Sequence, residues 1–279
     1  MKRRDALILL GVVATATPAH AAKVTTWPFS RRTSRRPLLL AGSSAMFELN
    51  RALTVEFSKR YPHIDVVIEA GSSLSALIAL KRGAIDVAAM DRDLTEGEDE
   101  KSLCNYLIAR NAVDIVVNRE STISSLTSDQ VRGLLTGEIV NWARVGGPNA
   151  AVQVVAGAHG TPARHFIEEE ILAGGDLAVT THVCDTPKQI IETVANDPRA
   201  IGCILFKDRQ DGESVRHVLV NGVDASPATI LSNRYPYTQS LYLAVMNDDP
   251  KSPARLFVDF TRSAAGQSIV DTHRFVTTY

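Results

Sequence analysis

Three turns rich in serine and glycine contain the residues of this chain best suited to binding chemistry. Gly71-Ser72-Ser73 separates a β-branched run from a helix-forming segment, and Gly42-Ser43-Ser44 has the same position after an earlier strand. His159-Gly160-Thr161 precedes a third predicted helix. Each turn combines polar side chains with the free backbone N–H groups of a helix start, which together bind anions. One such turn alone is more simply an N-cap, but three of them can converge on a single anion.

An acid and a base follow the strand predicted at 84–90. Asp91 and Arg92 stand at its carboxyl end, where α/β sheets bind ligands. A carboxylate repels a bound dianion unless one ligand oxygen carries a proton, which the acid then accepts in a charge-assisted hydrogen bond. Monohydrogen phosphate has that proton and sulfate lacks it. A buried acceptor left unpaired against sulfate costs roughly a few kcal/mol of binding free energy. The simpler alternative is that Asp91 caps the strand end or pairs with Arg92.

The elements that position these residues follow from the spacing of apolar side chains. Short β-branched runs alternate with segments that have apolar residues at helical intervals, which is typical of an α/β fold. Thr127 and Gln130 form a capping box at one helix start, and Pro187 opens another helix. We expect strands at 37–40, 64–70, 84–90, 114–118, 152–155, 179–184, 200–206 and 240–245, and helices at 46–60, 75–81, 125–136, 161–172, 186–196, 252–262 and 266–272.

The first residues have the order of an export signal. Lys2-Arg3-Arg4 precedes an apolar run at 6–14, and Ala19-His20-Ala21 fits a cleavage site. The arginine pair allows a twin-arginine signal. We therefore predict a signal peptide at 1–21 and a mature periplasmic protein that begins at Ala22.

The remaining sequence contains no second membrane signal. Residues 39–43 resemble a lipoprotein box, but Ser43 stands where cysteine is required, so we predict no lipid anchor and no membrane insertion. The net charge of −1 argues against a nucleic-acid-binding protein. The basic run at 31–36 belongs to a segment, 22–36, that we interpret as a disordered linker; a patch for membrane lipid or acidic glycan is the alternative.

The three cysteines, Cys104, Cys184 and Cys203, lack the spacing of a zinc site. An exported protein can form one disulfide from them, and the sequence does not decide which pair. Because each cysteine lies among apolar residues, we expect buried free thiols instead.

Several segments resemble the phosphate-binding proteins of high-affinity phosphate ABC transporters, which are type II periplasmic binding proteins. The resemblance covers the two Gly-Ser-Ser turns and continues in order to the C-terminus. It is carried further by DVAAMDRDL from Asp86, LTSDQVRGLLTGEIVNW from Leu126, AIGCILF from Ala200, YPYTQSLYLAV from Tyr235 and FVDFTRSAAGQ from Phe257.

This resemblance implies a two-lobed fold in which each lobe is a mostly parallel sheet flanked by helices, with the ligand cleft between the lobes. Lobe 1 is expected at 37–116 and 239–279, and lobe 2 at 117–238. The implied protein is a monomer that captures an oxyanion, most simply phosphate, and delivers it to an ABC transporter permease without any cofactor.

The resemblance also assigns individual residues. Ser44, Ser72 and Asp91 match family positions that hold phosphate, and Gly160 and Thr161 match the end of a family loop. The family's arginine before that loop is absent, and His159 replaces a serine. Arg92 or Arg164 restores the charge in our interpretation, although an exposed Arg164 paired with Glu168 is an alternative. The candidate ligand-binding residues are Ser43, Ser44, Ser72, Ser73, Asp91, Arg92, His159, Gly160, Thr161 and Arg164.

Other function classes find less support in the sequence. The Gly42 turn lacks the final glycine of a nucleophile elbow, and no P-loop or Rossmann fingerprint is present. His159 and His165 are too far apart in sequence to share a helix face as a zinc pair. We therefore expect a binding protein that is not an enzyme and has no metal site. The alternatives are a sensor that binds a protein partner, a receptor for another oxyanion or a phosphonate, and a small hydrolase.

Overall fold

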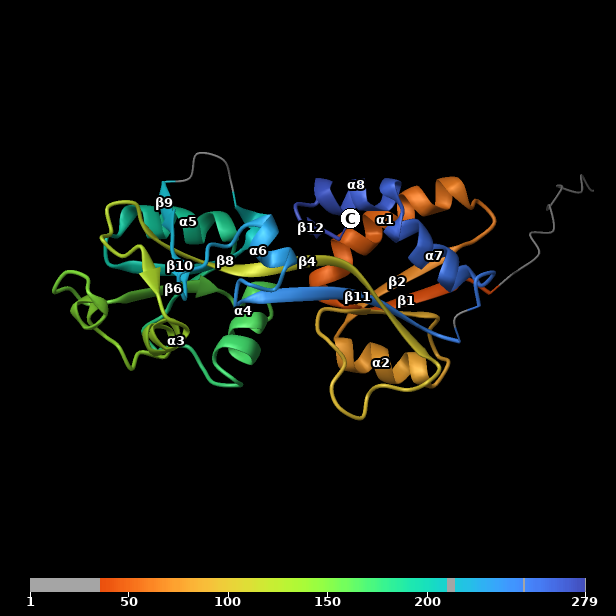
Figure 1. Ribbon diagram of the computed structural model, residues 1–279, viewed down its shortest axis with the longest axis horizontal. Coiled ribbons are helices and arrows are strands. Elements are labelled where there is room, and N and C mark those ends of the chain that lie inside the picture. The colour runs from red at the N-terminus through yellow and green to blue at the C-terminus, as the bar shows by residue number, and fades with distance from the viewer. Residues whose placement is uncertain (1–35, 210–213, 248, 279) are drawn as a thin grey trace, which may run out of the picture. The chain divides into compact units, whose positions relative to one another are not determined.

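The structure is a computed structural model that describes residues 36–209, 214–247 and 249–278 (Figure 1). The predicted signal peptide at 1–21 lies outside these residues, as does the predicted linker except for Arg36. The described chain is a mixed α/β fold, as the alternation of strands and helices predicts. None of its helices is long and apolar enough to cross a membrane.

Ten of the described strands form one sheet, and three parallel strands build its first end. These are β2 (Val66–Gly71), β1 (Leu38–Ser43) and β3 (Val87–Met90), with β1 in the middle. The first strand is longer than the predicted 37–40 because it stays paired with β2 as far as Ser43. Gly42 permits this, since a Cβ atom there would lie 1.9 Å from the carbonyl oxygen of Ala89 on β3. The glycine is therefore required by a close approach of two strands.

Two long strands connect this end to the rest of the sheet. β4 (Leu103–Asn118) pairs with antiparallel β11 (Thr238–Met246) along its first part and with β8 (Ala200–Leu205) along its second. The strand predicted at 114–118 is thus only the last part of β4. The prediction missed residues 103–113 because Asn105, Arg110 and Asn111 interrupt the apolar pattern.

The second end of the sheet is again mostly parallel. There β8 is followed by β6 (Gln153–Gly157) and β7 (His182–Cys184), and β6 is parallel to both neighbours; β7 is shorter than the strand predicted at 179–184. β9 (Val215–His217) and β12 (Val276–Thr277) both pair with β4, while β5 (Ser125–Leu126) and β10 (Leu219–Val220) form a separate two-stranded sheet.

The helices cover both faces of the sheet (Figure 1). At the first end, α1 (Phe47–Arg60), α7 (Pro253–Arg262) and α8 (Ala264–Thr272) lie on one face, and α2 (Ser73–Lys81) lies on the other. At the second end, α5 (Pro187–Asn196) packs on the face opposite the remaining helices. These helices are α3 (Ser128–Thr136), α4 (Pro162–Phe166), which continues into the π-helical turn η3 (Ile167–Ile171), and α6 (Pro227–Leu231). The short 3-10 turns are η1 (Ser44–Met46), η2 (Trp142–Val145) and η4 (Phe206–Asp208).

The predicted capping box forms at the start of α3, and a second one, which was not predicted, forms at the start of α5. Thr127 accepts a hydrogen bond from the backbone of Gln130, whose side chain accepts one from Thr127 N–H, and Thr186 and Gln189 repeat the arrangement. Each box satisfies helix-start donors that would otherwise lack an intrahelical partner.

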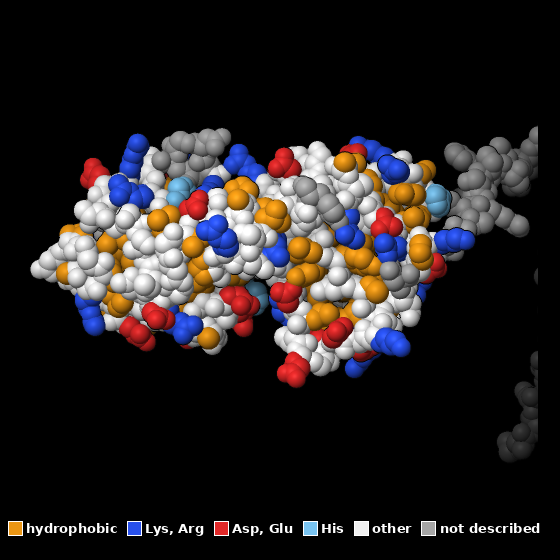
Figure 2. All heavy atoms as spheres, in the orientation of Figure 1, with side chains coloured by type: hydrophobic (Ala, Val, Ile, Leu, Met, Phe, Trp, Pro, Cys, Tyr) orange, Lys and Arg blue, Asp and Glu red, His pale blue; other side chains and the backbone are white. Residues whose placement is uncertain are grey.

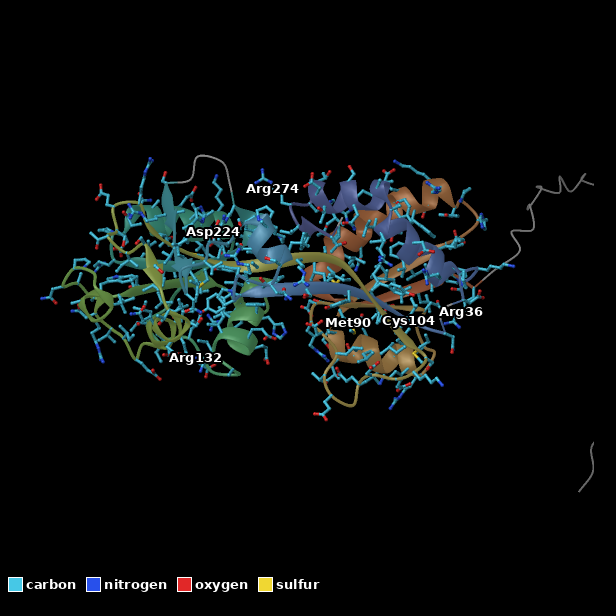
Figure 3. All side chains as sticks on the ribbon, in the orientation of Figure 1. Arg36, Met90, Cys104, Arg132, Asp224 and Arg274 are labelled. Carbon is cyan, nitrogen blue, oxygen red and sulfur yellow. The ribbon has the colours of Figure 1, made fainter. Side chains whose placement is uncertain are left out.

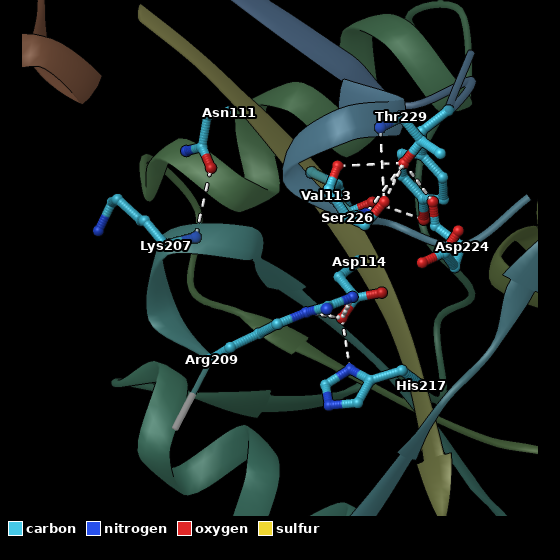
Figure 4. A network of polar contacts seen from close by, with 10 residues as sticks. Asn111, Val113, Asp114, Lys207, Arg209, His217, Asp224, Ser226 and Thr229 are labelled. Carbon is cyan, nitrogen blue, oxygen red and sulfur yellow. Dashed lines mark hydrogen bonds and ion pairs between the residues drawn. The ribbon is translucent and has the colours of Figure 1, made fainter. Parts of the chain in front are cut away.

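A buried carboxylate fixes β4 to the segment that follows β8 (Figure 4). Asp114 is fully buried, and its Oδ2 lies 2.7 Å from Nε of Arg209 and 2.5 Å from Nδ1 of His217. Because a buried charge is costly unless it is paired, the arginine stabilises this carboxylate and holds the two segments together. His217 is therefore a structural histidine of the second end.

The cysteines are all unbonded. Cys184 and Cys203 are buried, as predicted, but Cys104 near the start of β4 is partly exposed (Figure 3). Burial raises the pKa of Cys203 to about 12, so this thiol stays protonated and unreactive at neutral pH.

Candidate ligand-binding cleft

The carboxyl ends of β1 and β3 and the starts of α1, α2 and α4 border one cleft. Its volume is about 590 Å³. We call one side the serine wall, which comprises Ser43, Ser44, Ser72, Ser73, Asp91 and Arg92. The opposite side is the glutamate wall, which comprises Gly160, Pro162, His165, Phe166, Glu168, Glu169 and Glu170. Turns from distant parts of the chain thus meet at a single cavity.

Asp91 is the centre of the serine wall. Its Oδ2 accepts a hydrogen bond of 2.7 Å from the Ser43 hydroxyl, and its Oδ1 accepts one from the Ser73 hydroxyl. The Ser73 hydroxyl also accepts a 3.0 Å bond from the backbone N–H of Asp91. These contacts fix the carboxylate between two turns. Because two carboxylate oxygens offer about four acceptor positions, the two serines leave capacity for a ligand proton.

The two other serines have different surroundings. Ser72 is the N-cap of α2 and forms a reciprocal capping box with Ser75. Ser44 begins η1 directly before α1, at the cleft surface. The first backbone N–H groups of a helix have no intrahelical partner and point out of its start. The wall therefore combines hydroxyls and N–H donors around one acid.

Arg92 pairs with Glu98 and not with Asp91. Its two terminal nitrogens lie 2.7 and 2.8 Å from the two carboxylate oxygens of Glu98, a bidentate arrangement. The hydrogen bond from Arg92 lowers the pKa of Glu98 to about 2. The same hydrogen bond is the main cause that raises the pKa of Arg92, and the negative charge of Glu170 raises it further. The predicted anion donor is thus already bound to an acid.

Arg164, the second predicted donor, is also paired. Its Nε donates to Glu168 Oε1, and Nη2 lies 3.4 Å from Nε2 of His159. The alternative of an Arg164–Glu168 pair is therefore present, but the arginine is buried, not exposed as expected. The side chain is not part of the cleft lining.

His159 and Thr161 do not line the cleft either. His159 is exposed and approaches Glu168, with Nδ1 3.3 Å from the carboxylate. Thr161 occupies the N-cap position of α4, but its hydroxyl donates to the carbonyl of Ala158 at 2.8 Å and forms no side-chain cap. Of this predicted loop, only Gly160 reaches the cavity.

Acidic side chains therefore dominate the charge of the cleft. Among the described residues that line it, Arg92 is the one arginine or lysine, against four carboxylates, Asp91 and Glu168 to Glu170. Figure 2 shows acidic side chains on both sides of the indentation at the lower edge of the view. This acidic lining was not predicted from the sequence. The spacing of Glu168 from Arg164 was visible in the sequence, but the direction of η3 was not.

Two further residues escaped prediction. Glu98 lies in a loop without a motif, and Gln239 at the start of β11 lines the cleft although it belongs to a strand assigned only a structural role. No cluster of three or more histidine, cysteine or acidic residues suited to a metal ion occurs in the part of the chain that the structure describes.

Comparisons with known proteins agree with this architecture. A family model described as a PBP superfamily domain matches residues 16–265. The phosphate-binding protein PstS of Bacillus subtilis is 26% identical over 239 residues, which is 84% of this chain and 78% of that protein. PstS of Borreliella burgdorferi is 25% identical and covers 85% and 88% of the two chains. A crystal structure of an ABC-type phosphate transport receptor from Vibrio cholerae superposes with a TM-score of 0.82 at 22% identity, over 86% of this chain and 99% of that one.

Proposed function

This chain belongs to the PBP superfamily, and from that premise we propose that it is an exported solute-binding protein that captures phosphate in the cleft. The phosphate-binding names of its relatives support this ligand. A crystal structure of a phosphate ABC transporter substrate-binding protein with bound phosphate, from Clostridium perfringens, is 26% identical with a TM-score of 0.64. Delivery to an ABC transporter permease completes the proposed role.

The arrangement of Asp91 between Ser43 and Ser73 carries the proposal. Hydrogen bonds from the two hydroxyls fix the orientation of the Asp91 carboxylate at the carboxyl ends of the strands. The carboxylate lines the cleft and keeps acceptor positions for a ligand. A phosphate bound at the helix starts donates its proton to Asp91 and accepts hydrogen bonds from backbone N–H groups. Sulfate has no proton to donate and leaves the acid against a dianion. The site therefore selects protonated oxyanions.

The cleft closes around its ligand in this proposal. The described chain has four clusters of core residues, two of them packed around α1, α7 and α2 and two around α3 and α5. We take them as the cores of the two lobes, 37–116 with 239–279 and 117–238, which β4 and β11 connect. Rotation about these strands would bring the glutamate wall and the start of α4 to an anion on the serine wall.

Calorimetric titration of the purified protein with phosphate and with sulfate tests the function. We expect one phosphate per chain and a rise in melting temperature, because a ligand that binds only the folded state stabilises by RT ln(1 + [L]/Kd). Arsenate, which also carries a proton, should bind like phosphate. An equal response to sulfate would contradict the role of Asp91, and no response to any of the three would contradict the function.

An aminoalkyl phosphonate is the second candidate ligand, and the glutamate wall favours it. The cavity of about 590 Å³ has room beyond an inorganic anion, and Glu169 and Glu170 are exposed toward it without an ion-pair partner among the described residues. A cationic amine would meet these acids while the phosphonate occupies the serine wall. Tighter binding of 2-aminoethylphosphonate than of phosphate would establish this alternative.

A further inference from the structure

We propose that Arg110 on β4 supplies the positive charge that compensates the acids of the cleft when the anion binds. This inference rests on the proposed function. The two arginines beside the cleft that the sequence singled out, Arg92 and Arg164, are occupied by Glu98 and Glu168. A dianion that enters a cavity lined mainly by carboxylates requires a further cation.

The strand register places Arg110 beside the cleft, although Arg110 is not one of its lining residues. It pairs with Ser240 of β11, and the two residues that precede Ser240 both line cavities. Gln239 lines the ligand cleft, and Thr238 lines an adjoining cavity of about 270 Å³. The two cavities share Phe166 and Glu170, so they border the same wall.

Arg110 lies on the face of the sheet that carries α2, because its partner Ser240 is two residues from Tyr242, which packs against core residues of α2. Tyr242 is two residues after Ser240, and its hydroxyl donates to Asp93, two residues beyond Asp91. Burial and the bond to Asp93 raise the pKa of Tyr242, while the charge of Arg110 opposes that rise. Tyr242 thus links the strand position next to Arg110 to the loop that begins with Asp91.

The hydrogen-bonding state of Arg110 distinguishes it from the other two arginines. Its Nε and Nη1 atoms are buried and have no hydrogen-bond partner. No ion pair of Arg110 occurs among residues 36–209, 214–247 and 249–278. Buried donors that remain unpaired cost free energy, and native proteins keep few of them without a functional reason. A guanidinium matches the paired oxygens of a phosphate, because its donors form a planar fork.

Calorimetry with inorganic phosphate on four proteins tests the inference: the parent, Arg110→Met, Arg110→Lys and Arg144→Met. Arg144 is an exposed arginine on η2, outside the cleft, and controls for the loss of charge. We expect Arg110→Met to weaken phosphate binding about tenfold to a hundredfold, the effect of losing a charged hydrogen bond. Arg110→Lys should keep part of the affinity because it keeps the charge, and Arg144→Met should bind like the parent.

Thermal unfolding without phosphate separates a ligand-binding role from a structural one. If Arg110 serves the ligand, methionine removes unpaired donors, and the melting temperature stays unchanged or rises. Phosphate binding by Arg110→Met at the parent affinity would overturn the inference and leave the proposed function intact. A loss of binding that follows a lowered melting temperature, and that Arg110→Lys does not relieve, would assign Arg110 to the fold. Absence of phosphate binding by the parent would instead overturn the proposed function, and this inference with it.

Discussion

The serine wall and the glutamate wall begin from the same local pattern, a strand followed by a glycine turn and a helix start. They differ in where their polar groups are directed. In the serine wall, the hydroxyls of Ser43 and Ser73 converge on Asp91 from two different turns. Beside the glutamate wall, the Thr161 hydroxyl bonds its own turn, and Arg164 bonds Glu168 of the wall, one helical turn away.

This difference separates a site that is organised before binding from one that has to be reorganised. Contacts between distant turns fix a carboxylate whatever the ligand, so they reduce the ordering that binding requires. Contacts within one helix end satisfy the same groups locally and keep them from the cleft. We therefore expect ligand selection to reside in the serine wall and tuning of affinity in the glutamate wall.

The largest expected effect comes from the centre of the serine wall. Asp91→Asn should weaken phosphate binding by about 2–3 kcal/mol, because the amide cannot accept the ligand proton in a charge-assisted bond. Preference over sulfate should fall with it. Calorimetry with both anions measures each change, and Asp65→Asn, at an exposed acid after α1, is the matched control. Unchanged selectivity in Asp91→Asn would remove the serine wall from ligand selection.

The sequence predicted the serine wall better than the glutamate wall for a physical reason. Strand ends, capping boxes and helix starts are local, so residues 71–73 and Asp91 could be placed from their neighbours alone. The bond from Ser43 to Asp91 joins residues 48 positions apart and needs the order of β1 and β3. The Arg164–Glu168 spacing was equally local, but its burial depends on how α4 and η3 pack.

The partners of charged side chains were the second feature that could not be predicted from the sequence. Arg92 was predicted as an anion donor because nothing in the loop after it marks Glu98 as its partner. Arg110 was not predicted as a site residue, because the first part of β4, to which it belongs, was not predicted as a strand. Its burial follows from the pairing of β4 with both β11 and β12.

An intermediate effect on phosphate affinity should follow from removing the ion pair between Arg164 and Glu168. Glu168→Gln removes one acid from the cleft and releases Arg164 from its ion pair. Phosphate should then bind about threefold to tenfold more tightly, since one like charge about 4 Å away costs about 1 kcal/mol at the dielectric constant of water. Calorimetry checks this against Glu192→Gln, which breaks an exposed pair with Lys188 on α5. Weaker binding in Glu168→Gln would mean that the glutamate wall already has its binding geometry.

The smallest expected effect concerns the Arg92–Glu98 pair and appears in stability. Because Arg92 holds the pKa of Glu98 at about 2, below the ordinary value of 4.5, the pair stabilises the folded state above pH 4.5. That contribution should be lost progressively as the pH falls from 4.5 towards 2. Glu98→Gln should therefore lower the free energy of unfolding at pH 6 by less than about 1 kcal/mol, as accessible ion pairs do, and by almost nothing near pH 2.

Urea unfolding of the parent and of Glu98→Gln at pH 6, 4 and 3 measures this difference, with exposed Glu120→Gln as the control. Other carboxylates titrate equally in both proteins, so the difference between them isolates Glu98. The same variant releases Arg92 on the serine wall, where a free guanidinium faces the cavity. A stability difference that is constant with pH would show that Glu98 acts by packing and not by its charge. A difference that shrinks with acid, combined with tighter phosphate binding at pH 6, would show that the pair restrains the serine wall as the Arg164 pair restrains the glutamate wall.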